Sequence, residues 1–324
     1  MSQFTSVTDV SGQQIARIGS GLNRPESVLA TRSGNLFSCD WTAGIVKTTA
    51  DGKSSPAVAH DLIADKFLPN GIALQKDGRF LFANLGEAGG VWQIATTGAP
   101  REFLTEVEGR KIPPANFVYV DGARTWITVS ASTRAHKYFT AQETSGFIAV
   151  VENGQARIVA ENLTWTNELR IAPDRRHLYV NETFACKTTR FDLAHNGDLS
   201  NRHSFDYPPG TFPDGMAFDV EGALWSVCVV SNRIIRLLPG IGWNIVFEDV
   251  LQDTFARVCQ AYSANQMTRD MIVESRGKHV ANLTSLAFGG SDLRTLYLGS
   301  LTNSSILSLR SPVAGLAPEH WEWG

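Results

Sequence analysis

The sequence predicts an all-β fold, a six-bladed β-propeller with four-stranded blades and a ring closed by an N-terminal strand. A short motif led by a polar residue occurs six times, at intervals of 44 to 51 residues apart from one interval of 70. Further short apolar strands follow each copy, and one such sheet cannot bury both of its faces alone. Groups of four short strands at this period are therefore typical of propellers.

Each copy begins with its polar residue, continues with alternating apolar residues, turns, and resumes as a second strand about nine residues later. In the second copy Asn70 precedes Ile72 and Leu74, the chain turns at Asp77-Gly78, and Phe80-Leu81-Phe82 follows. Such alternation predicts strands rather than helices. The six polar residues are Glu26, Asn70, Asn116, Asn167, Asp214 and Thr284.

Third and fourth strands complete most of the copies. The predicted third strands are Ile45-Val46-Lys47, Val91-Trp92-Gln93-Ile94, Phe147-Ile148-Ala149-Val150, Thr189-Arg190-Phe191, Arg233-Ile234-Ile235-Arg236 and Ser305-Ile306-Leu307. The predicted fourth strands include Arg101-Glu102-Phe103-Leu104, Arg157-Ile158-Val159-Ala160 and Asn244-Ile245-Val246-Phe247.

The sixth copy lacks an outer strand after Leu309, whereas residues 14–18 lie unassigned before the first copy. We expect these N-terminal residues to pair with the sixth blade, which closes the ring and removes its open edge. Closed all-β folds often exceed the usual domain length. The 324 residues therefore predict a single domain over 1–324, with the repeat region at about 14–309 and a C-terminal tail at 311–324.

Composition excludes several classes of partner. The net charge is −3 and no basic run occurs, so nucleic acid is not an expected partner. Residues 1–7 lack a basic segment followed by an apolar core, and no apolar run approaches membrane-spanning length, so we expect a cytoplasmic protein without membrane contact. The four cysteines lack metal-binding spacing, and we expect free thiols.

Geometry brings the six polar residues together, because the first strand of every propeller blade lines the central channel and all six run in the same direction. Their starting residues then converge on the axis. A position that served packing alone would be apolar or glycine, whereas here it is polar in all six copies. The alternative is that these side chains cap turns or hold channel water.

The converging residues carry only oxygen donors of the carboxylate, amide and hydroxyl kinds. Such a set suits a hard divalent cation, with Ca²⁺ as the first choice and Mg²⁺, Mn²⁺ or Zn²⁺ as alternatives. Glu26 and Asp214 balance one divalent charge, and Asn116 and Asn167 add carbonyl oxygens. A cation so placed can polarise a carbonyl or phosphoryl oxygen and lower the pKa of bound water, which indicates a hydrolase.

Other catalytic devices are missing from the sequence, including the G-x-S-x-G elbow, phosphate-binding glycine loops and the H-E-x-x-H helix. His136 is the histidine placed nearest the expected mouth, although a solvated loop position explains it equally simply. Asp40-Trp41, Asn181-Glu182 and Ser130 end second strands on the same face, where either substrate contact or turn capping is expected.

Two insertions emerge on the face that carries the six residues. Residues 134–145 separate the second and third strands of the third blade, and residues 248–277 join the fifth blade to the sixth. Long loops beside a site often serve as lids or binding walls. The apolar spacing in the second insertion is compatible with a short amphipathic helix, whose apolar face could equally serve packing alone.

The motifs also resemble those of the senescence-marker-protein, gluconolactonase and luciferin-regenerating-enzyme-like family of six-bladed propellers, and more distantly diisopropyl fluorophosphatase. The resemblance spans nearly the whole repeat region. It is carried by Arg24-Pro25-Glu26-Ser27-Val28, Leu68-Pro69-Asn70-Gly71-Ile72-Ala73, Thr166-Asn167-Glu168-Leu169, Ala172-Pro173-Asp174, Leu178-Tyr179-Val180 and Pro213-Asp214-Gly215-Met216-Ala217.

The resemblance implies one divalent metal at the channel mouth, held here by Glu26, Asn116, Asn167 and Asp214. It also implies lactone hydrolysis, in which the metal polarises the lactone carbonyl and Asp214 acts as general base toward water. In this picture Asn70 and Thr284 orient the substrate or the water.

The third copy departs from the sugar-lactonase pattern, because Pro114 and Phe117 stand where the family often has Arg and Asp. Aromatic residues are also expected near the mouth, either in contact with substrate or as core between blades. They are Trp41, Phe117, Trp165, Phe184 and Phe212. We therefore expect a small-molecule lactone or ester that is less hydroxylated than a sugar lactone, with Asn70, Thr284, Trp41, Phe184 and Phe212 as its contacts.

Two other functions remain compatible with the sequence. The same metal site could serve organophosphate hydrolysis, or a non-hydrolytic isomerisation or cyclisation. Alternatively, the propeller could bind a ligand without catalysis, and its metal would then be structural.

Overall fold

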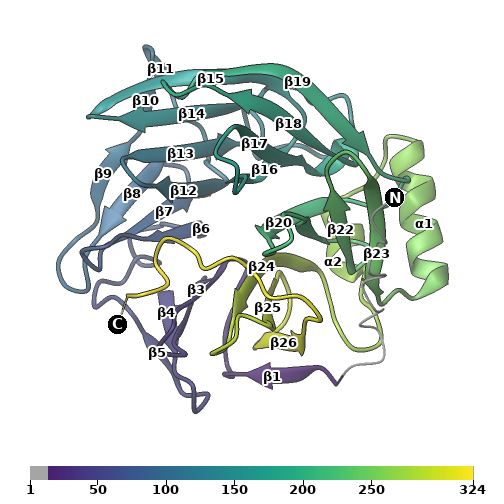
Figure 1. Ribbon diagram of the computed structural model, residues 1–324, viewed down its shortest axis with the longest axis horizontal. Coiled ribbons are helices and arrows are strands. Elements are labelled where there is room, and N and C mark those ends of the chain that lie inside the picture. Colours follow the sequence, from purple (N-terminus) through teal and green to yellow (C-terminus); the bar gives the residue numbers. More distant parts are fainter. Residues whose placement is uncertain (1–13, 324) are drawn as a thin grey trace.

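Six four-stranded antiparallel sheets surround a central channel in the computed structural model, which describes residues 14–323 (Figure 1). The six-bladed propeller predicted from the repeat is confirmed. The blades are β2 (Val28–Ala30), β3 (Leu36–Asp40), β4 (Gly44–Thr48) and β5 (Ser54–Pro56); β6 (Pro69–Leu74), β7 (Phe80–Asn84), β8 (Val91–Ile94) and β9 (Arg101–Leu104); β12 (Phe117–Asp121), β13 (Arg124–Val129), β14 (Gly146–Glu152) and β15 (Gln155–Leu163); β16 (Thr166–Ile171), β17 (His177–Glu182), β18 (Lys187–Leu193) and β19 (Leu199–Asp206); β20 (Pro213–Phe218), β21 (Leu224–Cys228), β22 (Arg233–Leu238) and β23 (Gly242–Glu248); and β24 (Leu283–Gly289), β25 (Thr295–Ser300), β26 (Ile306–Arg310) and β1 (Ala16–Ile18).

The N-terminal strand closes the ring as expected, although it is shorter than the predicted segment. β1 pairs antiparallel with β26, with Ala16 opposite Ser308 and Ile18 opposite Ile306. The last sheet is therefore built from both ends of the described chain. This pairing covers the edge of β26, which would otherwise present unpaired backbone groups.

Large apolar side chains fill the spaces between neighbouring blades. Phe37 of the first blade lies 5.3 Å from Phe80 of the second, measured between ring centroids, and Trp225 of the fifth blade lies 5.7 Å from Phe288 of the sixth. Trp126, from the third blade, is fully buried against a cluster that includes Leu169 of the fourth. The blades thus bury their faces on one another, as the period of the repeat predicted.

The innermost strands break their pairing at the polar repeat positions. The register of β6 against β7 shifts between Pro69 and Ile72, and that of β16 against β17 shifts between Thr166 and Leu169. The same shift occurs between Pro213 and Met216 in β20. Bulges of this kind bend a strand and re-aim its side chains, so they turn Asn70, Asn167 and Asp214 away from an ordinary ladder position.

The two insertions lie together beside the channel. The segment after β23 forms α1 (Gln252–Ser263) and α2 (Arg269–Glu274), and the loop between β13 and β14 meets it where the backbone N–H of Phe139 donates to the carbonyl of Met267 at 2.9 Å. Phe139, Met267 and Ile272 share one apolar cluster. The expected helix in the second insertion is present. The minor elements are β10 (Glu106–Val107), β11 (Arg110–Lys111) and a 3₁₀ turn, η1 (Thr183–Ala185).

The C-terminal tail crosses the ring at the end of the channel away from the polar repeat residues (Figure 1). The backbone N–H of Leu316 donates to the carbonyl of Phe218 at 3.0 Å, and the N–H of Arg32 donates to the carbonyl of Trp321 at 2.8 Å. The Trp323 ring packs 5.5 Å from that of Phe37. The tail therefore covers the far end of the channel.

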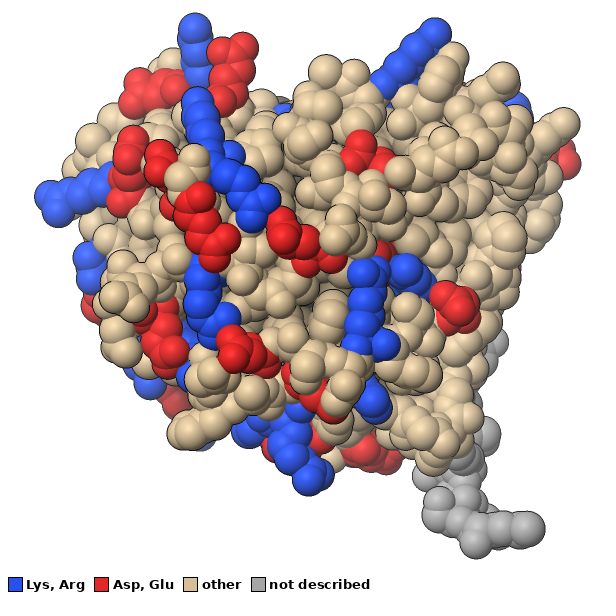
Figure 2. All heavy atoms as spheres, turned by 90° about the horizontal axis from the view of Figure 1, so that it is seen from above, with Lys and Arg blue, Asp and Glu red and all other residues tan. Residues whose placement is uncertain are grey.

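Charged side chains of both signs alternate on the outer edge of the molecule, where β15 and β19 lie (Figure 2). Ion pairs such as Arg157 with Asp198 account for part of this pattern. Within residues 14–323 no helix is long and apolar enough to span a bilayer. The expectation of no secretory signal concerns residues 1–7, which lie outside the described residues.

His320, in the tail, makes the stability of this closure depend on pH. Burial, together with the positive charge of Arg170, lowers the pKa of His320 to about 4 from its ordinary value of 6.5. The unfolded chain then binds this proton more readily than the folded one. The contribution of His320 to the free energy of unfolding is therefore complete above pH 6.5 and falls as the pH drops toward 4.

We expect the free energy of unfolding of wild-type protein to fall by on the order of 2 kcal/mol more than that of His320→Gln across this window. Urea unfolding from pH 7 to pH 4 measures this difference. The exposed His203→Gln control should follow wild type, and parallel curves for wild type and His320→Gln would contradict the assignment.

Candidate metal centre

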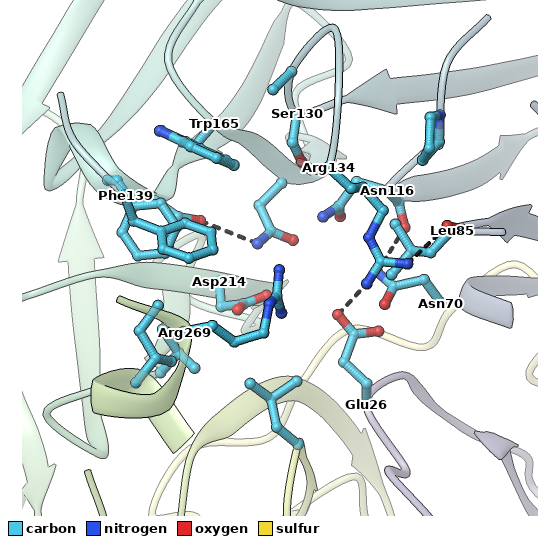
Figure 3. A pocket seen from close by; sticks show the side chains of 18 of the residues that line it. Glu26, Asn70, Leu85, Asn116, Ser130, Arg134, Phe139, Trp165, Asp214 and Arg269 are labelled. Atoms are coloured by element: carbon cyan, nitrogen blue, oxygen red, sulfur yellow. Dashed lines mark hydrogen bonds between the residues drawn. The ribbon is translucent and has the colours of Figure 1, made fainter. Parts of the chain in front are cut away.

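Five of the six polar repeat residues line one cavity at the start of the innermost strands (Figure 3). These are Glu26, Asn70, Asn116, Asn167 and Asp214, and they come from five blades. The cavity volume is about 120 Å³, several times the space that one water molecule occupies. The sixth, Thr284, is buried beside them and its hydroxyl donates to the Glu26 carbonyl at 2.9 Å.

Three side-chain oxygens in this cavity are buried without a hydrogen-bond partner. They are Oδ1 of Asn116, Oδ1 of Asn167 and Oδ1 of Asp214. Buried polar atoms are nearly always paired, because an unpaired one forfeits its hydration without compensation. Three unpaired oxygen acceptors in one cavity form an environment in which a cation would be favoured.

Hydrogen bonds fix the orientation of the neighbouring groups. The Asn167 amide nitrogen donates to Thr183 Oγ1 at 3.0 Å, and Thr183 Oγ1 donates to the Pro213 carbonyl at 2.8 Å, so the amide oxygen of Asn167 is left for the cavity. The Asn70 amide nitrogen donates to Glu26 Oε1 at 3.0 Å and to the Asn116 carbonyl at 2.9 Å. Asn70 therefore positions Glu26, and its own amide is fully engaged.

The carboxyl groups of this cavity are held in an environment that disfavours their charge. Burial raises the pKa of Glu26, against the opposing effect of Arg24. Burial also raises the pKa of Asp214 well above its ordinary value, and the negative charges of Glu26 and Glu168 add to the effect. A divalent cation would favour both ionised forms. Two carboxylates with two amide oxygens suit a hard cation, and Glu26, Asn116, Asn167 and Asp214 are the residues that would hold it.

A metal centre at this cavity would depend on amide ligands. Within residues 14–323 no group of three or more His, Cys, Asp and Glu side chains is placed to hold a metal ion. All four cysteines are unpaired, as expected, and three of them are buried. The ligand set predicted from the repeat, with its two amide oxygens, stays a prediction.

Glu168 is a third buried carboxyl in the channel that the sequence reasoning did not single out. Its Oε2 accepts from the backbone N–H of Met216 at 3.3 Å and pairs with Arg170 at 2.9 Å. Burial raises its pKa to about 7. Its place directly after a repeat residue, on a strand that lines the channel, was the available signal.

Apolar residues from the insertions and the innermost loops form the walls of the cavity. Phe184, expected to contact substrate, lines it with Phe139, Trp165, Ile272 and Leu301. Phe139 and Phe184 lie 4.9 Å apart between ring centroids. Both insertions therefore supply walls, as their expected position on this face predicted.

Three expected substrate contacts lie behind the walls of the cavity. Phe212 is fully buried and packs 5.4 Å from the Phe184 ring. Trp41 lies under the Arg24 guanidinium at 4.2 Å, and its Nε1 donates to the Pro69 carbonyl at 3.0 Å. Thr284 is engaged with backbone, as described above. Phe212 and Trp41 thus pack against the cavity residues Phe184 and Arg24, respectively, and do not line the cavity themselves.

Most ends of the second strands have capping and scaffolding roles. Asp40 accepts from the backbone N–H groups of Asn23 and Thr42, both at 2.7 Å, and Asn181 donates to the Asp214 carbonyl at 2.9 Å. Glu182 pairs with Arg202. Ser130 lines the cavity, and its hydroxyl donates to the Thr166 carbonyl at 2.7 Å.

His136 belongs to the insertion wall and does not line the cavity. Its Nε2 lies 3.3 Å from a Glu143 carboxylate oxygen, and its ring packs edge-on against Trp165 at 5.0 Å. The side chain therefore supports Trp165.

Three arginines line the mouth of the cavity and were not identified from the sequence as site residues. They are Arg24, just before β2, Arg134 in the β13–β14 loop, and Arg269 at the start of α2. No sequence spacing connects these positions, because the fold alone brings the three segments together.

The fold and cavity define a six-bladed propeller with a polar cavity at the starts of its innermost strands. A model of the SMP-30/gluconolactonase/LRE-like region matches residues 55–245, more than half of the chain. The chain belongs to this family.

Curated relatives carry different names. A 6-deoxy-6-sulfogluconolactonase of Pseudomonas putida is 28% identical over 149 residues, which cover 45% of this chain and 41% of that protein. Strictosidine synthase-like 7 of Arabidopsis thaliana is 25% identical over 320 residues, covering 90% and 80%. Regucalcin of Oryctolagus cuniculus is 31% identical over 97 residues, covering 29% and 32%. The chain thus spans less than half the length of the first and third of these relatives.

Solved structures share the fold. A gluconolactonase from Xanthomonas campestris superposes with a TM-score of 0.69 at 15% identity, over 94% of this chain and 92% of that one. A calcium-binding regucalcin from Agrobacterium tumefaciens superposes with a TM-score of 0.61 at 17% identity, over 93% and 95%. At these identities the likeness shows the fold alone.

Removal of one amide ligand tests the metal centre directly. We expect Asn167→Ala to weaken Ca²⁺ binding by at least about tenfold, which corresponds to about 1.4 kcal/mol, because one of the three unpartnered oxygens is lost. Isothermal titration of metal-stripped protein with Ca²⁺ measures this change. The exposed Asn196→Ala, in the β18–β19 hairpin, is the control. Equal affinities for wild type and Asn167→Ala would remove Asn167 from the ligand set.

Proposed function

We propose that this chain is a metal-dependent hydrolase that opens a lactone or a related ester. The observation that carries the proposal is the set of three buried, unpartnered oxygens, on Asn116, Asn167 and Asp214, that face one cavity together with Glu26. A divalent cation held by these four residues would act as a Lewis acid toward a carbonyl oxygen and lower the pKa of bound water.

Asp214 is the general base in this proposal. Burial raises its pKa well above the ordinary carboxyl value. A bound cation would favour the ionised form of Asp214, which is the form that accepts a proton. Its carboxylate takes a proton from the attacking water as the carbonyl carbon becomes tetrahedral. The bond between the carbonyl carbon and the ring oxygen then breaks, and Asp214 returns the proton to that oxygen. The product is a hydroxy acid, and the carboxylate of Asp214 is regenerated.

The surrounding residues keep the reacting groups in place. Asn70 holds Glu26 and the backbone of Asn116, and Thr183 holds the Asn167 amide, so the inward oxygens are fixed before substrate binds. Such preorganisation avoids reorientation during the reaction. Phe139, Trp165 and Phe184 exclude water and favour a substrate body with few hydroxyl groups.

The comparisons support the class of reaction. The family description includes gluconolactonase, and one curated relative is named as a lactonase. Regucalcin relatives and a structure described as a calcium-binding protein support calcium as the cation. The substrate and the metal of this chain are proposals that rest on its own cavity.

Asp214→Asn separates catalysis from metal binding, because Asn keeps an oxygen ligand but is not a base. We expect kcat on a responsive lactone to fall about 100- to 10,000-fold, while Ca²⁺ is still bound. Acid release from a panel of sugar, aliphatic and aromatic lactones, with metal-stripped protein and added Ca²⁺, measures turnover.

The exposed Asp51→Asn is the matched control and should behave as wild type. Undiminished turnover by Asp214→Asn would show that another group is the base. If wild-type protein binds Ca²⁺ and releases acid from no lactone or ester, the hydrolase proposal is wrong, and a non-hydrolytic reaction or ligand binding takes its place.

A further inference from the structure

The three arginines at the cavity mouth lack carboxylate partners. Arg24 donates to Asn70 Oδ1 at 2.8 Å and lies over the Trp41 ring, and Arg134 donates to the Leu85 carbonyl at 2.7 Å. Arg269 lies 5.2 Å from the centre of the Phe139 ring. In the described part of the chain none of the three guanidinium groups forms an ion pair. Each therefore keeps donor capacity that the protein itself does not use.

Elsewhere this protein pairs arginines with buried carboxylates. The buried Arg236 lies 2.8 Å from Asp219 and also contacts Glu221, and the exposed Arg202 lies 2.8 Å from the buried Glu182. A half-buried arginine without an ion pair, as at Arg24 and Arg134, is costly by comparison. Two such groups in one cavity, with the exposed Arg269 beside them, therefore call for an explanation other than stability.

The arginines also repel one another. Burial and then the charges of Arg269 and Arg24 lower the pKa of Arg134 to about 10, and burial and then Arg24 lower the pKa of Arg269. Arg24 has a left-handed backbone conformation, with φ of 59°, which is uncommon outside glycine. An anion among the three guanidinium groups would relieve the repulsion and complete their hydrogen bonds.

The arginines share the cavity with the proposed reaction centre. Figure 3 shows Arg134 entering the cavity on the side of Glu26 and Asn70, and Arg269 entering on the side of Asp214. When ionised, Glu26 and Asp214 would carry two negative charges, which one divalent cation would balance. Arg24 also acts on both carboxyl groups through its charge. The charges of the three guanidinium groups would then exceed those of the carboxylates, and the cation's charge would add to the excess. The wall of the same cavity also includes the apolar side chains of Phe139, Phe184 and Ile272.

We propose that the substrate carries an anionic group, a carboxylate, sulfonate or phosphoryl group, which Arg24, Arg134 and Arg269 bind while its ester or lactone carbonyl faces Asp214. This inference rests on the proposed hydrolase function for the identity of the reacting group. The anion site itself rests on the arginines alone. The predicted substrate class is thus an anionic lactone or ester with a sparsely hydroxylated body.

Binding of unreactive ligands tests the anion site without turnover. Benzenesulfonate, benzoate and phenylphosphonate share an apolar ring with neutral benzamide and contain no lactone. By isothermal titration of Ca²⁺-loaded protein we expect at least one of these anions to bind at least about tenfold more tightly than benzamide, with affinity that falls as salt rises. The comparison among them identifies which anionic group the site prefers. Equal affinities for the anions and benzamide would overturn the proposal.

Variants assign the binding to the arginines. We expect Arg134→Gln and Arg269→Gln each to weaken binding of the preferred anion by about tenfold or more, the loss of one charge-assisted hydrogen bond, with benzamide unaffected. Arg134→Lys keeps the charge and should lose less than Arg134→Gln. The control is Arg257→Gln on α1, whose exposed side chain pairs with Glu274 outside the cavity. Circular dichroism shows whether each variant is folded, and unchanged anion affinity in folded Gln variants would refute the site.

A matched pair of lactones connects the anion site to catalysis. We expect 5-oxotetrahydrofuran-2-carboxylate to be hydrolysed with a higher kcat/KM than its neutral primary amide, and Arg269→Gln to remove that preference. Turnover of both compounds at equal efficiency would leave the hydrolase intact and overturn the anionic substrate. Anion binding that depends on the arginines, without hydrolysis of any lactone, would support the anion site and overturn the hydrolase proposal.

Discussion

The convergence of six parallel strand starts on one axis is the constraint on which the site depends. Each innermost strand begins beside its neighbours, and at Asn70, Asn167 and Asp214 a break in the ladder turns the side chain toward the channel. No single blade could bring these oxygens together. Because packing between blades fixes the ring, core residues such as Trp126 and Trp225 also fix the distances within the site.

Burial gives these groups their chemical character. The same low-polarity surroundings that raise the pKa of Asp214 also leave amide oxygens without partners and leave the arginines partly desolvated. A folded chain tolerates such groups when the rest of its core is well packed. One cavity thus holds both hydrogen-bond acceptors without partners, on Asn116, Asn167 and Asp214, and guanidinium groups with unused donors.

The sequence was sufficient for the fold and for the oxygen set, because both depend on a repeat whose signals are local: strand alternation, turns and a polar residue at a fixed place. The sequence was insufficient to predict the arginines of the cavity mouth. Arg24 lies before β2, Arg134 lies in the β13–β14 loop and Arg269 begins α2, so no repeat spacing relates the three positions. Phe212 and Trp41 were expected as substrate contacts because sequence shows proximity along a strand, whereas the structure decides which ring faces the cavity and which supports it.

The C-terminal tail determines which end of the channel is accessible to ligands. Because Leu316, Pro318 and His320 line the opposite end of the ring with the innermost strands, that end is not an open bore. With the tail across that end, a small molecule that reaches Asp214 would enter and leave past the starts of the innermost strands. Substrate binding and product release would then use the same opening. Slow release of an anionic product past the guanidinium groups of Arg24, Arg134 and Arg269 would limit the turnover rate.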